Sequence, residues 1–100
     1  MVKHIILWKL KEEYSAEEKA EIKNNIKKNL EALAGVIPGL IKIRVNHTGL
    51  KSSTADLMLD SCFESADALK NYSVHPAHQQ AANTFVRPFV QTRLCLDFEE

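Results

Sequence analysis

The first predicted strand, residues 2–10 (VKHIILWKL), is apolar on both of its faces, and this constrains the fold more than any other segment. Side chains alternate between the faces of a strand, so His4, Ile6 and Trp8 share one face, while an isoleucine and a leucine occupy the other. A strand that is apolar on both faces is typically covered on both. We therefore expect helices on one face of its sheet and, on the other, the sheet of an identical subunit. An ordinary solvated sheet face is the alternative.

A capping box marks the start of the first predicted helix. The hydroxyl of Ser15 can accept from the N–H of Glu18, while the Glu18 carboxylate reaches back to the backbone of Ser15. Apolar residues then recur at helical spacing, namely Ile22, Ile26, Leu30 and Leu33. Gly35 can end this helix in a left-handed conformation, and Pro38-Gly39 turns the chain.

Three further strands are predicted at residues 40–47, 55–63 and 90–98, because apolar and polar residues alternate there. A short helix capped by Ser65, with Asp67 in its first turn, and a second short helix after Pro76 separate the last two strands. We expect the more apolar face of each strand to lie beneath the helices. These faces carry Ile41, Ile43 and Val45, then Leu57, Leu59, Ser61 and Phe63, then Val90, Thr92, Leu94, Leu96 and Phe98.

The order β-α-β-β-α-β predicts an α+β, ferredoxin-like domain over residues 1–100, with a four-stranded antiparallel sheet and helices on one face. Right-handed crossovers place the first and third strands at the centre. Cys62 and Cys95 then lie on strands that flank the first strand, roughly 9–10 Å apart. This separation is too large for a disulfide, so free thiols are expected.

Composition excludes several classes of function. With 13 basic and 13 acidic residues, the chain lacks the basic surface expected of a nucleic-acid-binding protein. The apolar run at residues 5–8 is too short for a signal peptide or a membrane span, so a cytoplasmic protein without a membrane partner is expected. One cysteine pair and four scattered histidines give no zinc signature, and no glycine-rich phosphate loop follows a strand. We therefore expect neither a metal nor a cofactor.

The segment from Tyr72 to His78 (YSVHPAH) is the strongest candidate for chemistry. Pro76 must end the incoming helix but can begin a new one, which places His75 near an N-cap and His78 in a first turn. Histidines that are held in position and titrate near neutral pH suit proton transfer. Helix capping and a structural Tyr–His hydrogen bond are the alternative interpretation.

The chain resembles the stress-responsive α/β-barrel domain family, also called the dimeric α/β-barrel proteins. The resemblance is carried by Val2-Lys3-His4-Ile5, Ile37-Pro38-Gly39-Leu40, Phe63-Glu64-Ser65, Tyr72 with His75-Pro76-Ala77-His78, and Leu96-Asp97-Phe98. It implies a ferredoxin-like subunit and a homodimer in which the two sheets form a barrel. Most members of the family have no assigned activity.

One plant relative, olivetolic acid cyclase, closes a linear polyketide, and the resemblance implies roles for two residues here. His78 would be a general base and Tyr72 would donate a hydrogen bond to the developing oxyanion. His4 matches a further pocket histidine of the cyclase. This chain departs from the cyclase at Leu57, where the cyclase has a histidine, and on the first helix. The candidate ligand contacts are His4, His75, Leu57 and Ile26.

Three functions remain open from the sequence. The first is a dimeric domain that binds a small apolar or aromatic metabolite. The second is a cofactor-independent enzyme, similar to a polyketide cyclase or, by fold analogy alone, to small monooxygenases. The third is a stress factor that protects proteins and has no small ligand. RNA recognition is rejected, because the candidate aromatics on the strands, Trp8 and Phe63, are expected to face the helices.

Overall fold

The computed structural model describes all 100 residues and has the predicted order of elements. The elements are β1 (Val2–Leu10), α1 (Ala16–Glu31), β2 (Leu40–Asn46), β3 (Leu57–Phe63), α2 (Ala66–Val74), α3 (Pro76–Ala81) and β4 (Val90–Glu99). A π-helical turn (Ala82–Val86) and a 3-10 turn (Arg87–Phe89) join α3 to β4. The antiparallel sheet has the order β2-β3-β1-β4, with β1 and β3 at its centre as predicted.

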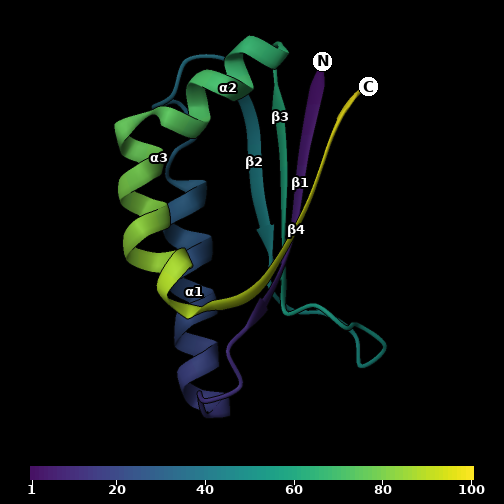
Figure 1. Cartoon of the computed structure of the whole chain (residues 1–100), viewed down its shortest axis with the longest axis vertical. Helices are drawn as coiled ribbons and strands as arrows, with labels where there is room; N and C mark the ends of the chain where they lie inside the picture. Colours follow the sequence, from purple (N-terminus) through teal and green to yellow (C-terminus); the bar gives the residue numbers. More distant parts are fainter.

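The helices form one layer against one face of the sheet, and the other face carries no helix (Figure 1). The two chain ends lie side by side, and the Glu100 N–H donates to the carbonyl of Met1 at 2.8 Å. No helix combines the length and apolar character that crossing a bilayer requires. The cytoplasmic location stays a prediction.

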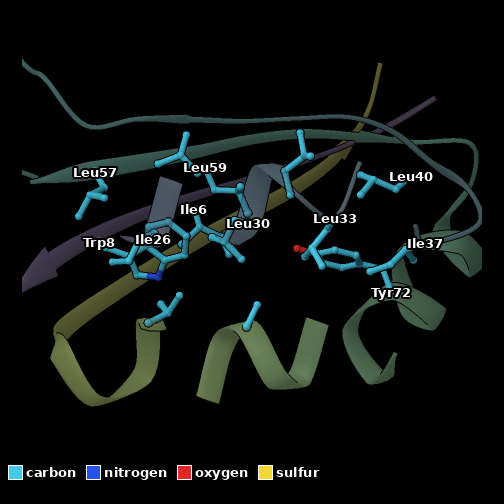
Figure 2. Close-up of a cluster of buried hydrophobic side chains, with 14 of the residues drawn as sticks. Ile6, Trp8, Ile26, Leu30, Leu33, Ile37, Leu40, Leu57, Leu59 and Tyr72 are labelled. Carbon is cyan, nitrogen blue, oxygen red and sulfur yellow. The ribbon is translucent and has the colours of Figure 1, made fainter. Parts of the chain in front are cut away.

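The predicted capping box begins α1. The Ser15 hydroxyl accepts from the Glu18 N–H at 3.1 Å, and Glu18 Oε1 accepts from the Ser15 N–H at 2.8 Å. The apolar stripe of this helix is buried. Its side chains pack against those of the strands and of α2 in one hydrophobic core (Figure 2). Ile26, Phe63 and Tyr72 are among the most buried side chains of this core.

The turn at Gly39 requires glycine for two reasons. Its φ of +83° lies in the left-handed region, and a Cβ built there would lie 2.5 Å from the Cβ of Ala68 in α2. Gly35 has a similar φ of +78°, but a Cβ at that position would meet nothing within 4 Å. The close approach at Gly39 therefore lets α2 pack directly against the turn before β2.

The predicted inward face of β2 is wrong at one residue. Ile41 is 45% exposed, while Leu40 before it is buried. The register shifts between Leu40, which pairs with Phe63, and Lys42, which pairs with Cys62, so Ile41 is an extra residue in a β-bulge. Beyond the bulge the prediction holds, since Ile43 and Val45 are buried.

The predicted inward face of β4 is wrong along most of the strand. Leu94 and Leu96 are each 64% exposed and Phe98 is 40% exposed, because they lie on the uncovered face. The register shifts at the end of β1, where Leu10 pairs with Val90 and Lys9 pairs with Thr92. Gln91 is the extra residue, and a shift of one residue turns every later side chain to the opposite face.

Two consequences follow from this shift. Arg93, Cys95 and Asp97 pair with Trp8, Ile6 and His4 of β1 and lie on the helix-facing side of the sheet, where all three are exposed. Cys62 pairs with Lys3 on the uncovered face, so the two cysteines lie on opposite faces of the sheet. This geometry gives free thiols, as predicted, although the alternation along the two strands predicts that both cysteines share one face.

Candidate functional site

A cavity of about 690 Å³ lies between the helical layer and the β1–β4 side of the sheet. Its polar wall combines side chains of β1, the α2–α3 segment and β4. They are His4, Lys70, Tyr72, Ser73, His78, Arg87, Gln91, Arg93, Cys95 and Asp97. Its apolar wall includes Ile6, Trp8, Leu30, Leu59, Leu69, Val86 and Val90. The cavity therefore offers a mostly apolar body with polar groups concentrated on β4 and around the helix break.

Tyr72 borders this space from the last turn of α2 and is only 1% exposed, and its ring lies among buried apolar side chains (Figure 2). Its ring packs edge-on against Phe63, with ring centroids 4.9 Å apart. The phenol oxygen is buried and has no hydrogen-bond partner. Burial raises the pKa of Tyr72 well above its usual value. The phenol is therefore protonated at neutral pH and is a hydrogen-bond donor without an acceptor.

His78 lies against Tyr72, with ring centroids 4.3 Å apart. The proline break positions it, since α2 ends at Val74 and α3 begins at Pro76. Its Nδ1 lies 3.1 Å from the carbonyl oxygen of Ser73. Because a carbonyl only accepts, Nδ1 carries the proton and Nε2 is the basic nitrogen of the neutral ring. Burial, together with nearby positive charge, lowers the pKa of His78, so the ring is neutral at pH 7.

His4 lies on the helix-facing side of β1 and is 7% exposed. Its Nδ1 forms a hydrogen bond with Oδ1 of Asp97, which is the directly opposite residue on β4. Cys95 completes the group, with Sγ 3.7 Å from His4 Nδ1 and 3.4 Å from Asp97 Oδ1. Burial and the neighbouring carboxylate of Asp97 raise the pKa of the Cys95 thiol. The backbone of His4 is fixed by Ser61, whose buried hydroxyl donates to the His4 carbonyl at 2.8 Å.

The charge of the cavity wall is predominantly positive. Lys70, Arg87 and Arg93 line it, against the single carboxylate of Asp97. Arg87 donates to the amide oxygens of Gln79 and Asn83, and none of the three cations forms an ion pair. The wall therefore presents cations whose charge no carboxylate compensates.

Three of the predicted site residues line this cavity and three do not. His4, Tyr72 and His78 are brought together, with the His4 and Tyr72 ring centroids 6.3 Å apart. His75 instead caps α3, where its Nδ1 accepts from the Ala77 N–H at 3.1 Å. Leu57 and Ile26 are buried in the hydrophobic core. These residues are absent from the cavity wall because capping and core packing occupy their side chains.

The alternation along β4 does not identify its polar residues as part of the cavity, because it predicts that they lie on the uncovered face of the sheet. Only the bulge at Gln91 brings Arg93, Cys95 and Asp97 into the cavity. One feature of the sequence does point to Asp97. Because β1 and β4 are antiparallel neighbours, His4 near the start of the chain lies opposite an acidic residue near its end.

Comparison with known proteins gives the family. The sequence profile of the stress-responsive A/B barrel domain matches residues 2–100. A dimeric protein of unknown function and ferredoxin-like fold from Bacteroides fragilis is 34% identical, with a TM-score of 0.92 over 99% of this chain and 95% of its own. No curated protein matches the sequence.

More distant structures share the fold. A dimeric ferredoxin-like protein of unknown function from Thermobifida fusca is 21% identical, with a TM-score of 0.79 over 97% of this chain and 88% of its own. A hydroxynitrile lyase from Passiflora edulis is 17% identical, with a TM-score of 0.77 over 97% of this chain and 90% of its own. The match along the whole sequence, together with the ferredoxin-like sheet, confirms the predicted relationship: the chain belongs to the stress-responsive A/B barrel domain family.

Proposed function

We propose that this protein is a homodimer that binds a small organic ligand in the cavity between its helices and its sheet. One observation carries the proposal: the Tyr72 hydroxyl is buried at the cavity wall and has no hydrogen-bond partner. An unsatisfied buried donor costs about 1–3 kcal/mol, and a ligand that accepts its hydrogen bond removes this cost. A volume of about 690 Å³ also lies within the range of typical ligand pockets.

The chemistry of the wall defines the class of ligand. Apolar residues such as Ile6, Leu30 and Val86 suit an apolar or aromatic body. The uncompensated cations Arg87 and Arg93 suit an anionic group, which forms charge-assisted hydrogen bonds with guanidinium. The proposed ligand is therefore an apolar or aromatic molecule that carries a carboxylate or a similar anion.

The uncovered sheet face supports the homodimer. Leu7, Leu94, Leu96 and Phe98 are all exposed on it, and they come from the neighbouring strands β1 and β4. Contiguous exposed apolar side chains mark interaction surfaces. Relatives from Bacteroides fragilis and Thermobifida fusca are described as dimeric. Two copies joined through this face enclose their apolar residues between two sheets.

A cofactor-independent enzyme is the second candidate, and the contact between Tyr72 and His78 favours it. In this mechanism Nε2 of neutral His78 removes a proton from the carbon next to a substrate carbonyl. The electrons of the broken C–H bond form an enolate, and the Tyr72 hydroxyl donates a hydrogen bond to its oxygen. Cyclase-like and monooxygenase-like reactions can both begin in this way. The hydroxynitrile lyase from Passiflora edulis is an enzyme with the same fold, which is support by fold analogy alone.

Fluorescence of Trp8 tests ligand binding, because this is the only tryptophan and it lines the cavity. The probe is 8-anilino-1-naphthalenesulfonate, an aromatic anion. We expect saturable quenching of Trp8 with one probe per subunit. Arg93→Ala removes a charge-assisted hydrogen bond and weakens binding about tenfold or more. Lys28→Ala, which removes an exposed positive charge on α1, leaves the affinity unchanged. The absence of saturable quenching in the wild-type protein would leave a role without a small ligand.

Exchange of protons in heavy water tests the enzyme. The substrate is 4-oxodecanoate, which combines an apolar chain, a ketone and a carboxylate. We expect the wild-type protein to accelerate deuterium incorporation next to the ketone, measured by NMR. His78→Gln abolishes the acceleration, while the variant still binds the probe saturably. Equal exchange rates with the wild-type protein and with His78→Gln exclude His78 as the base.

A further inference from the structure

We propose that His4, Cys95 and Asp97 form a zinc site on the β1–β4 wall of the cavity. The fold brings them together from opposite ends of the chain. His4 of β1 is directly paired with Asp97 of β4, and Cys95, two residues before Asp97, points to the same face of the sheet. One ligand atom from each residue lies within 4.8 Å of the other two.

The distances fit a tetrahedral ion. Zinc bonds of about 2.0 Å to nitrogen or oxygen and about 2.3 Å to sulfur place neighbouring ligand atoms roughly 3.3–3.6 Å apart. Cys95 Sγ lies 3.7 Å from His4 Nδ1 and 3.4 Å from Asp97 Oδ1. Only the hydrogen-bonded pair of His4 and Asp97 must move apart. The ion takes the place of the hydrogen bond between these two atoms: His4 binds through Nδ1 as a neutral imidazole whose proton lies on Nε2, and the Cys95 thiol releases its proton.

The donor set selects zinc among common ions. A thiolate, an imidazole and a carboxylate are a borderline-soft set, which excludes magnesium and calcium. The thiolate and the carboxylate together neutralise a divalent charge. His4 is buried and its backbone is held by the hydrogen bond from Ser61, so the site has a rigid base.

Three protein ligands leave one coordination position open, as in catalytic rather than structural zinc sites. All three side chains line the cavity, so that position is available to water or to the anionic group of a ligand. The metal site does not depend on the proposed function, because an ion can bind whether or not the cavity holds an organic molecule. It departs from the sequence-based expectation of no metal, which rested on a single cysteine pair and on the scatter of the four histidines along the chain.

Cobalt titration of the full chain tests the site. Co²⁺ substitutes for zinc, and a bond from cobalt to a thiolate gives a charge-transfer absorption in the near ultraviolet. After treatment with a chelator and a reductant, we expect this band to saturate at one Co²⁺ per subunit and to disappear when Zn²⁺ is added. The affinity is expected to fall by about 100-fold or more in Cys95→Ser, which removes the sulfur ligand.

The second cysteine provides a matched control. Cys62 lies on the opposite face of the sheet, so Cys62→Ser retains the band and the affinity. Asp97→Asn keeps the thiolate band but weakens Co²⁺ binding, and it serves as the second variant should Cys95→Ser not fold, as judged by circular dichroism. Wild-type protein without a saturable band overturns the proposal. A band that persists in Cys95→Ser, or that is lost in Cys62→Ser, overturns it as well.

Discussion

Removal of a single oxygen atom, in Tyr72→Phe, is expected to stabilise the ligand-free protein. The ring of Tyr72 packs against Phe63 and His78, and phenylalanine preserves these contacts. The hydroxyl is buried without a partner, so the folded state loses its hydration and gains no hydrogen bond in return. An unsatisfied group of this kind costs about 1–3 kcal/mol. The free energy of unfolding should therefore rise by about 1–3 kcal/mol.

Thermal and guanidinium unfolding measure this change. For a domain of this size, about 1 kcal/mol corresponds to roughly 4–8 °C in Tm, so the increase is well above experimental error. Tyr14→Phe is the matched control, because Tyr14 is only partly buried and its hydroxyl lies beside Glu13. This control should change the free energy of unfolding by less than about 0.5 kcal/mol.

The same substitution should weaken the stabilisation that a ligand provides. A ligand that accepts from the Tyr72 hydroxyl raises Tm more in the wild-type protein than in Tyr72→Phe. A lower Tm for ligand-free Tyr72→Phe would refute the reasoning, because it would mean that the hydroxyl makes a favourable hydrogen bond in the free protein. Equal Tm values would refute it too, since they would mean that the hydroxyl is effectively hydrated.

Three further outcomes are expected. Burial lowers the pKa of His78 in the folded protein below its usual 6.5, so the stability contributed by the neutral ring is complete above pH 6.5 and is lost as the pH falls through the lower folded pKa. In urea unfolding from pH 8 to 5, the free energy of unfolding should therefore fall more steeply for the wild-type protein than for His78→Gln. Leu96→Asp should give a monomer by light scattering, whereas Val74→Asp, at a comparably exposed position on α2, should stay dimeric, and a dimer in both variants would exclude this face as the interface. Gly35→Ala should cost about 1–2 kcal/mol for its left-handed φ alone, while Gly39→Ala should cost roughly 2–5 kcal/mol because its Cβ also meets α2; equal costs would contradict that close approach.

Much of the fold was predictable because local signals agreed with the tertiary structure. The capping box at Ser15, the proline break at Pro76 and the alternation along β1 each depend on a few neighbouring residues, and each is present as predicted. Two residues of the cavity wall follow from the same signals, since His4 lies on the helix-facing side of β1 and Tyr72 lies in the last turn of an amphipathic helix. Their approach to His78 depends on the proline break.

The bulges were beyond reach, because they arise where edge strands pair with the sheet. Alternation along a strand shows which residues share a face, but a single unpaired residue inverts the phase of all that follow. Ile41 in β2 and Gln91 in β4 are such residues, and nothing in their immediate sequence marks them. The apolar content of its two faces is therefore a misleading guide to the orientation of β4. Apolar side chains lie on whichever face of a strand is covered, and a second subunit can cover a face as well as a helix can.

The bulge at Gln91 connects the two surfaces on which the proposed function depends. It turns Leu94 and Leu96 outward, onto the face proposed to meet a second copy, and by the same shift it turns Arg93, Cys95 and Asp97 into the cavity. Without the extra residue, the leucines would fill the cavity and the charged side chains would lie on the open sheet face. A polar cavity wall and an apolar docking face therefore arise together from one irregularity in an edge strand, so a change in the pairing of β4 must alter both the proposed dimer and the proposed ligand and zinc sites.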